Sequence, residues 1–144
     1  GRPQSGVAVT SAGNGELKES AQLWTSRNSP YVASPVFHEG HLYWMDRSGY
    51  AVCLNAKTGK EAYRERLQSS NRTPQFYASP VVVDGKIISA SRNAGTFVLE
   101  AKPKFKQLAQ NIFTSDRSVF NGSPAVSNGR LFLRSDTHLY CISE

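Results

Sequence analysis

The sequence of 144 residues predicts an all-β fold made of β-propeller blades, and three observations lead to this prediction. A Ser-Pro motif occurs three times, with its serines 45 and 44 positions apart: Ala33-Ser34-Pro35-Val36, Ala78-Ser79-Pro80-Val81 and Gly122-Ser123-Pro124-Ala125. A glycine turn follows each motif, and an alternating apolar segment follows each turn. Short strands that repeat at this period are typical of propeller blades.

The repeats are predicted to form four-stranded antiparallel sheets, with glycine and asparagine at corners that need positive φ angles. The predicted strands of the first repeat are residues 34–37, 41–45, 50–55 and 61–67. Those of the second repeat are residues 81–83, 87–91, 96–100 and 105–113. The third repeat has residues 125–126, 131–134 and 138–142, and it lacks a fourth strand of its own. These segments are rich in the β-branched and aromatic residues that suit half-buried sheets.

The N-terminal segment departs from the repeat. Residues 6–12 and 22–26 are predicted strands, and Trp24 gives the second one the character of an outer strand. This segment is either the tail of an earlier blade or the closing strand of the third repeat. We therefore divide the chain into a partial blade or closing strand (1–32), two blades (33–77 and 78–121) and an incomplete last blade with three strands (122–144).

The number of blades raises a question about the ring. Three blades are fewer than the four to eight of usual propellers, and an open arc would expose the apolar faces of its end blades. We expect a partial ring with further blades upstream, or a ring completed by several copies of the chain. The N-terminal residues Gly1-Arg2-Pro3-Gln4 do not resemble a signal peptide.

Composition narrows the range of partners. No run approaches the ~20 apolar residues of a membrane span, so we expect no membrane-spanning segment. The net charge of +6 permits an anionic partner. The densest basic run, Lys102, Lys104 and Lys106, is interrupted by Pro103 and Phe105. Nucleic-acid sites are usually denser and interleaved with exposed aromatic residues, so we do not expect a nucleic-acid partner.

The sequence contains no pattern that predicts catalysis or a metal site. Catalysis needs a base, an orienting group and a charge stabiliser that converge on one point, and no such spacing is present; we expect no catalytic residues. The two cysteines, Cys53 and Cys141, fall at matching positions of the first and third repeats. A whole blade separates them, which is too far for a disulfide. We expect both to be buried free thiols and expect no metal site.

The segment Val52-Cys53-Leu54-Asn55-Ala56-Lys57-Thr58-Gly59-Lys60 resembles the blade motif of the pyrroloquinoline-quinone-like (quinoprotein-type) β-propeller repeat family. In that motif an apolar strand leads into Leu-Asp-Ala-x-Thr-Gly, and a Trp of the outer strand docks on the neighbouring blade. Tyr63 holds the Trp position here, Trp24 holds it in the N-terminal segment, and Leu108 stands near it in the second repeat. Residues 20–144 look most like the C-terminal blades of bacterial members.

The resemblance does not extend to a cofactor site. Quinoprotein dehydrogenases carry an adjacent Cys-Cys pair, an indole platform and carboxylates that bind calcium. This sequence has no adjacent cysteines, and packing in strands accounts for Trp24 and Trp44. We expect no bound cofactor in these 144 residues.

One face of the predicted propeller gathers arginines and aromatic residues. The turns between second and third strands, and the connections between blades, share this face and meet around the central channel. The candidate ligand or partner face consists of Tyr31, Asp46, Arg47, Arg72, Phe76, Arg92, Arg117, Phe120, Arg134 and Asp136. It could hold an anionic sugar, a peptide carboxylate or a partner loop. Alternatively, the aromatic residues wedge the blades apart and the arginines are solvated or paired with Asp46 and Asp136.

Two functions follow from these features. The first is a non-catalytic binding or scaffold module for protein or saccharide partners. The chain resembles the outer-membrane assembly lipoprotein of Gram-negative bacteria, a propeller of this repeat type that binds partner proteins. The second is part of a quinone-dependent oxidoreductase whose active residues lie upstream. The absence of the cofactor residues favours the first, and the family's habit of export implies a periplasmic or secreted bacterial protein.

Overall fold

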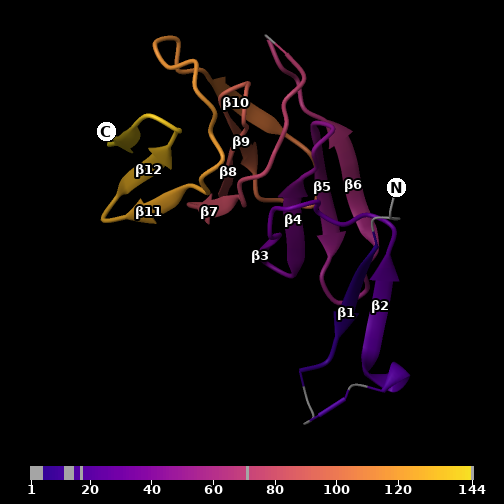
Figure 1. Cartoon of the computed structure of the whole chain (residues 1–144). Coiled ribbons are helices and arrows are strands. Elements are labelled where there is room, and N and C mark those ends of the chain that lie inside the picture. Colours follow the sequence, from indigo (N-terminus) through magenta and orange to yellow (C-terminus); the bar gives the residue numbers. More distant parts are fainter. Residues whose placement is uncertain (1–4, 12–14, 17, 71, 144) are drawn as a thin grey trace.

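The computed structural model describes residues 5–11, 15–16, 18–70 and 72–143, and its sheets form an open arc of propeller blades (Figure 1). A two-stranded sheet consists of β1 (Gly6–Val9) and β2 (Gln22–Ser26), with a short 3-10 helix, η1 (Glu19–Ala21), before β2. The described residues contain no helix with the length and apolar character needed to cross a bilayer. The prediction of an all-β protein is confirmed.

Two four-stranded antiparallel blades and one three-stranded sheet follow. The first blade contains β3 (Val36–His38), β4 (His41–Met45), β5 (Tyr50–Asn55) and β6 (Glu61–Arg66). The second contains β7 (Val81–Val83), β8 (Lys86–Ala90), β9 (Thr96–Glu100) and β10 (Gln107–Asn111). The third sheet contains β11 (Ala125–Ser127), β12 (Arg130–Arg134) and β13 (Leu139–Ile142). Each sheet pairs its strands in chain order.

The first hairpin of each sheet repeats the same tight turn. Asp84 and Gly85 have φ angles of 48° and 67°, and Asn128 and Gly129 have 49° and 71°. Glu39 and Gly40 adopt the same conformation, with φ angles of 43° and 78°. Two successive positive φ angles define the type I′ turn, whose twist matches that of antiparallel strands. The three glycine turns of the sequence therefore have one geometric cause.

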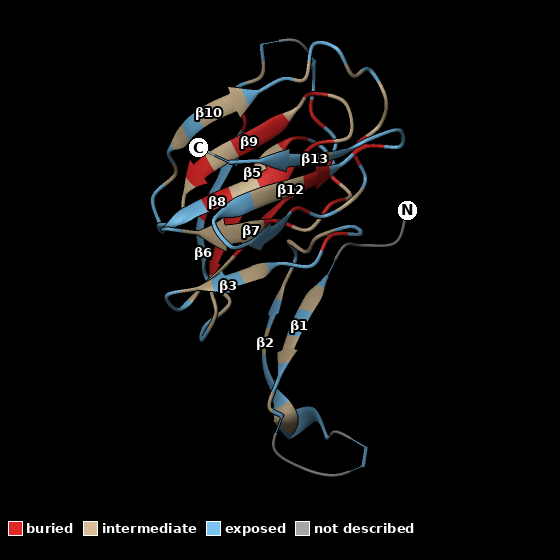
Figure 2. Ribbon diagram, turned by 90° about the vertical axis from the view of Figure 1, so that its left-hand side faces the viewer, coloured by how far each residue is buried: buried red, intermediate tan, exposed pale blue. Residues whose placement is uncertain are grey.

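The blades pack face to face, and the core lies between them (Figure 2). Successive side chains of a strand point to opposite faces. Tyr43 and Met45 of β4 accordingly pack against the second blade, where they meet Phe97 and Leu99 of β9. Trp44, between them, faces the other way, toward the N-terminal hairpin. The inner strands β3 and β7 contact each other at the axis of the arc.

The N-terminal hairpin docks on the first blade. The indole Nε1 of Trp24 donates to the carbonyl of Ala56 at 2.9 Å, and the ring lies against Gly59. Tyr63 makes the corresponding contact one blade later, with its ring centroid 5.6 Å from that of Phe105. The sheet order places neither β1 nor β2 beside β13, so the structure does not show the closing-strand arrangement.

The family motif has a local structural role. The side-chain Oδ1 of Asn55 accepts hydrogen bonds from the backbone N–H groups of Lys57 and Thr58 and from the Thr58 hydroxyl. This Asx turn leads into Gly59, which has a φ of 69° and whose lack of a Cβ leaves room for Trp24. The second blade lacks the motif, and Leu108 is 41% exposed instead of docking on a neighbour.

The expectation of two buried thiols is half correct. Both cysteines are free, and Cys53 is buried in the core between the blades. Cys141 is exposed, because β13 is the outermost strand of the third sheet and no fourth strand covers it in this structure.

Candidate ligand-binding face

The connections between blades and the turns between second and third strands meet on one face. The backbone N–H of Arg92 donates to the carbonyl of Gln75 at 2.8 Å, and that of Asp136 donates to Val119 at 2.9 Å. Both bonds join a strand turn to the connection that enters the same blade. A third bond, from the Phe120 N–H to the Arg92 carbonyl at 3.3 Å, ties the second blade to the next connection.

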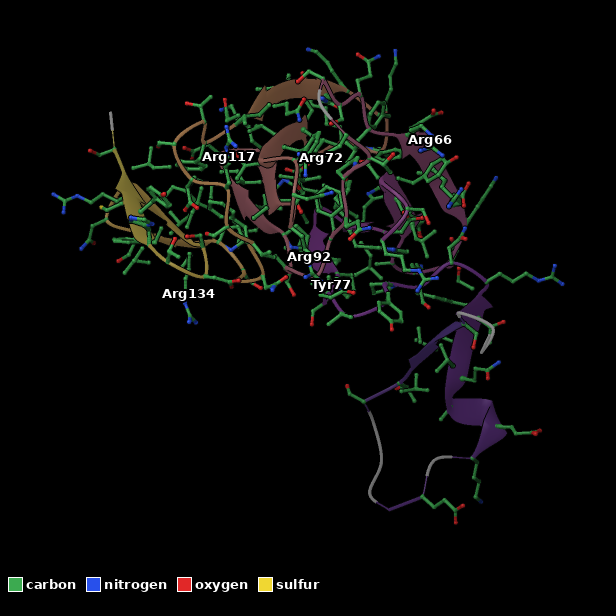
Figure 3. The ribbon with its side chains drawn as sticks, turned by 45° about the horizontal axis from the view of Figure 1, so that its top comes forward. Arg66, Arg72, Tyr77, Arg92, Arg117 and Arg134 are labelled. Atoms are coloured by element: carbon green, nitrogen blue, oxygen red, sulfur yellow. The ribbon has the colours of Figure 1, made fainter. Side chains whose placement is uncertain are left out.

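A row of tyrosines and arginines crosses the first two blades on this face. The rings of Tyr31 and Tyr77 lie 6.2 Å apart between centroids. The guanidinium of Arg47 lies over Tyr31 at 5.1 Å. The guanidinium of Arg92 lies over Tyr77 at 4.4 Å (Figure 3). Such cation–π pairs hold each guanidinium in place beside a ring. We call Tyr31, Arg47, Tyr77 and Arg92 the tyrosine row.

Asp46 serves the turn that carries Arg47. Its Oδ1 accepts the backbone N–H groups of Ser48 and Tyr50, and its Oδ2 accepts a charged hydrogen bond from Arg64 at 2.8 Å. Its partner is thus an arginine of the outer strand β6. Asp46 is therefore paired with an arginine, as the alternative arrangement expects. That arginine is Arg64, which is not one of the arginines of the candidate face.

Two predicted aromatic residues of the face are buried between sheets. Phe76 is only 1% exposed and packs edge-on against Phe97, with centroids 5.6 Å apart. Phe120 is 6% exposed and stacks with Phe113 and Tyr140 between the second and third sheets. Phe76 therefore fills the space between adjacent blades, as in the alternative arrangement, and offers almost no surface to a ligand.

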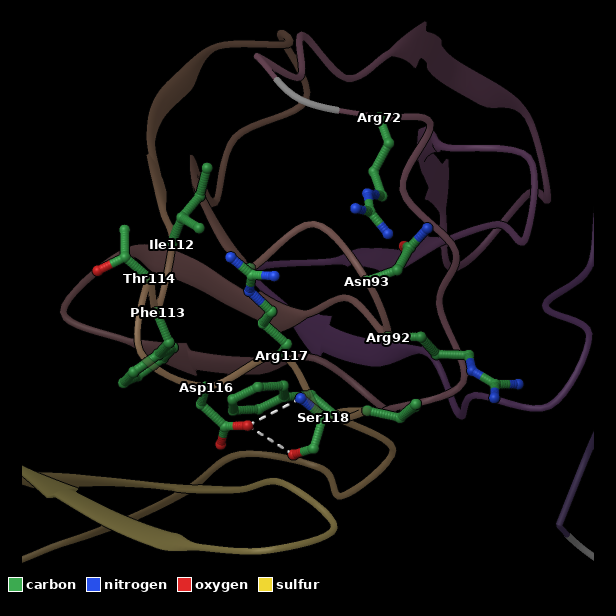
Figure 4. Close-up of a pocket in the computed structure, with 12 residues that line it drawn as sticks. Arg72, Arg92, Asn93, Ile112, Phe113, Thr114, Asp116, Arg117 and Ser118 are labelled. Atoms are coloured by element: carbon green, nitrogen blue, oxygen red, sulfur yellow. Dashed lines mark hydrogen bonds between the residues drawn. The ribbon is translucent and has the colours of Figure 1, made fainter.

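The hollow of this face lies where the connections flank the second blade. A cavity of about 610 Å³ opens there, and its walls come from residues 72, 92, 93, 95, 112–114 and 116–120. The side chains of Arg72 and Arg117 extend into the same space, with Asn93 between the two connections (Figure 4). Ile112, 42% exposed, supplies an apolar wall. We call this space the arginine cavity.

A polar cluster anchors the connection that bears Arg117. Asp116 accepts the backbone N–H of Ser118 at 2.8 Å, its hydroxyl at 2.6 Å and the Tyr140 hydroxyl at 2.7 Å. Hydroxyl groups of Ser118, Ser135 and Tyr140 thereby hold the pKa of Asp116 well below its usual range. The Asp116 side chain is 4% exposed, so its charge is engaged internally.

Arg134 and Asp136, the last two predicted face residues, are exposed, and neither lines the arginine cavity. Arg134 lies on β12, apart from Arg72 and Arg117 (Figure 3). Of the ten predicted residues, the structure brings Arg72, Arg92, Arg117 and Phe120 to the cavity and Tyr31, Arg47 and Arg92 to the tyrosine row.

Sequence reasoning missed Tyr77 and Asn93. Tyr77 stands two positions before the serine of its motif, whereas the predicted aromatic residues Tyr31, Phe76 and Phe120 each stand three positions before theirs. A sequence signal for the cavity does exist: Arg27, Arg72 and Arg117 are each 45 positions apart. The recurrence of arginine at one position of successive connections could have singled out these side chains.

Comparison with known proteins identifies the family to which the repeats belong. The sequence profile of the family described as "Outer membrane protein assembly factor BamB" matches residues 6–104, more than half of the chain. The chain belongs to the BamB family. No protein with a curated functional description matches the chain significantly.

Solved structures share the fold of this chain. BamB from Moraxella catarrhalis superposes with a TM-score of 0.70 at 13% identity over 99% of this chain. The chain spans 41% of the length of that structure. A quinohemoprotein alcohol dehydrogenase from Pseudomonas putida HK5 superposes with a TM-score of 0.50 at 18% identity, over 70% of this chain and 16% of that one. At these identities the similarity establishes the propeller fold.

The described residues do not fit a quinone cofactor. Trp44 is 2% exposed inside the core, and Trp24 is docked against Gly59, so neither offers a free indole face. In the part of the chain that the structure describes, no three His, Cys, Asp or Glu side chains gather in a group that could hold a metal ion. We therefore derive no chemistry through a quinone for this member of the BamB family.

Proposed function

We propose that this chain is a non-catalytic binding module of a BamB-type propeller, and that its loop face binds a partner protein of outer-membrane assembly. The observation that supports this most directly is the tyrosine row. Tyr31 is 54% exposed, and tyrosine and arginine are the residues most enriched at the energetic centres of protein interfaces. The family description names an outer-membrane assembly factor, and this supports a location in the cell envelope, on the periplasmic side of an outer membrane.

The stacking within the row favours a protein over a saccharide. Sugars bind aromatic rings through an open ring face. Arg47 and Arg92 already cover one face of Tyr31 and of Tyr77. The guanidiniums, the hydroxyls and the remaining ring surfaces together suit the mixed apolar and hydrogen-bonding contacts of a polypeptide.

Site-specific photo-crosslinking in the cell that produces the protein tests this function. A photoreactive phenylalanine replaces Tyr31 or Tyr77, and Glu65, exposed on the outer strand β6, provides the control position. We expect both row positions, and not the control, to form a discrete adduct with a component of outer-membrane assembly. Adducts with no such component, or equal labelling at the control position, would contradict the proposal.

Titration with pyrroloquinoline quinone and with neutral oligosaccharides tests the competing functions on the same protein. Tryptophan fluorescence reports quinone binding, and calorimetry reports sugar binding. We expect no saturable binding of either. Stoichiometric quinone binding would replace the proposal with an oxidoreductase, and sugar binding abolished by Tyr77→Ala would replace it with a saccharide receptor.

A further inference from the structure

We propose that the arginine cavity is a carboxylate-binding subsite, which receives an acidic side chain from an extended segment of the partner protein beside an apolar one. The inference rests on the proposed function, and it adds the chemistry of the segment and the place where it binds. Arg72 and Arg117, at equivalent positions of two successive connections, meet at this cavity (Figure 4).

The charge of the cavity walls favours an anion. Arg72, Arg92 and Arg117 line it, with the Arg92 guanidinium turned toward Tyr77, and Asp116 is the one carboxylate among its described lining residues. Three hydrogen bonds at 2.6 to 2.8 Å already engage Asp116. Within the described part of the chain, no ion pair or hydrogen bond engages the guanidinium of Arg117. An incoming carboxylate can therefore bind Arg117 without first displacing an internal partner, through the paired N–H groups that match its geometry.

Both connections that carry the arginines are held before any ligand arrives. The Asn93 side chain accepts the Gln75 N–H at 3.1 Å and donates to the Thr73 carbonyl at 3.2 Å, which anchors the segment next to Arg72. Asp116 and Ser118 anchor the two sides of Arg117. Loops ordered in advance lose less conformational entropy on binding, so a single acidic contact can contribute measurably to affinity.

The cavity wall also selects against a small free anion. Ile112 is 42% exposed, and the partly buried Phe113 lies next to it in the lining. A volume of about 610 Å³ exceeds what one carboxylate needs and falls in the range of sites for larger ligands. An acidic residue followed or preceded by an aliphatic one would fill both parts of this space, whereas inorganic phosphate would leave the apolar wall exposed.

Peptide binding to the 144-residue chain tests the inference. The probe is a capped, fluorescein-labelled peptide with two glutamates around a leucine, and the matched peptide carries glutamines instead. Fluorescence anisotropy gives the affinities, and NMR of 15N-labelled arginine side chains locates the contact. We expect the glutamate peptide to bind at least about tenfold more tightly than the glutamine peptide, and to shift the signals of Arg72 and Arg117.

Three variants of equal charge change separate a site from a general charge effect. Arg117→Gln and Arg72→Gln are each expected to weaken binding of the glutamate peptide about tenfold. Arg134→Gln removes an exposed arginine outside the cavity and is expected to leave affinity within twofold. Equal affinity for both peptides, equal loss in all three variants, or phosphate competing at lower concentration than the peptide would overturn the inference.

The two proposals fail in different ways. If wild type and Arg117→Gln form the same adducts at Tyr31 and Tyr77, partner binding stands and the carboxylate subsite is wrong. If the peptide binds as expected but no assembly component is cross-linked, the subsite stands and the identity of the partner is wrong. The Arg117 side chain is exposed, so we expect Arg117→Gln to keep the thermal stability of the wild type. A loss of peptide binding in this variant then reports on the cavity and not on unfolding.

Discussion

The backbone N–H of Ser34 donates a hydrogen bond to the hydroxyl Oγ of Ser79, 2.8 Å away and one full repeat later in the chain. The N–H of Ser79 donates in the same way to Oγ of Ser123, at 2.9 Å. The serine of each Ser-Pro motif therefore links its blade to the next one beside the inner strands. This link is a physical reason for the repetition of the motif.

Removing one hydroxyl from this chain of serines should weaken blade packing. Ser79→Ala and Ser123→Ala each leave one backbone N–H without its acceptor, and we expect a loss of about 0.5–1 kcal/mol in the free energy of unfolding. Ser127→Ala, an exposed serine of β11, is the matched control and should lie within a few tenths of wild type. Urea unfolding measures all three. A loss in the control as large as in Ser79→Ala would show that the link contributes nothing specific.

Docking of the N-terminal hairpin depends on Gly59. Gly59 and Gly85 have φ angles of 69° and 67°, so alanine at either position meets the same backbone strain of about 1–2 kcal/mol. Only at Gly59 would the added Cβ approach another residue, Trp24, at 2.5 Å. Gly59→Ala should therefore lose about 1–3 kcal/mol more than Gly85→Ala.

Fluorescence reports whether the hairpin moves in Gly59→Ala. In a Trp44→Phe background the emission comes from Trp24, and it should shift to longer wavelength as the ring leaves the first blade. The Gly85→Ala variant in the same background should keep the wild-type emission. If both variants lose the same stability and neither emission shifts, Trp24 does not hold the hairpin as the structure indicates.

The Asp116 cluster predicts acid sensitivity. Hydrogen bonds from Ser118, Ser135 and Tyr140 lower the pKa of Asp116 in the folded state, whereas an unfolded aspartate titrates near a pKa of about 4. A depressed pKa gives stability that is present above the unfolded value and lost as pH falls through it toward the folded one. The urea concentration at the midpoint of unfolding should therefore decrease as the pH is lowered from about 5 to about 2.

Asp116→Asn removes this ionisation and separates it from the rest of the acid response. We expect lower stability than wild type at pH 7 and a shallower fall between pH 5 and pH 2. Asp136→Asn, an exposed carboxylate of the neighbouring turn, serves as the control and should follow the wild-type profile. Parallel profiles for wild type and Asp116→Asn would mean that Asp116 is not stabilised by its hydroxyl partners.

The two thiols should react at very different rates. Burial raises the pKa of Cys53 to about 11, and its side chain is inaccessible in the core. Cys141 is exposed on β13. Ellman's reagent at pH 8 should modify one thiol per folded chain within minutes and both in guanidinium chloride, and Cys141→Ser should abolish the fast reaction. Rapid modification of two thiols in the folded protein would contradict the burial of Cys53.

Local sequence patterns predicted much of the strand layout. Strands β4, β5, β7 and β9 begin and end at the predicted residues, because period-two alternation and glycine turns act over a few neighbouring positions. Outer strands were less accurate: β10 spans Gln107–Asn111, whereas residues 105–113 were predicted. An outer strand pairs on one side only, so its ends depend on the packing of adjacent turns more than on its own residues.

The sequence by itself determined the all-β class, the blade period and the positions of the glycine turns. Tertiary structure alone decided that Phe76 enters the core while Tyr77 joins Tyr31 at the surface, and that Arg72 and Arg117 extend into one cavity. The physical reason is the sequence separation over which each interaction acts. Alternation and turn geometry are set by neighbouring residues, whereas the convergence of side chains 45 positions apart depends on how the blades pack against each other.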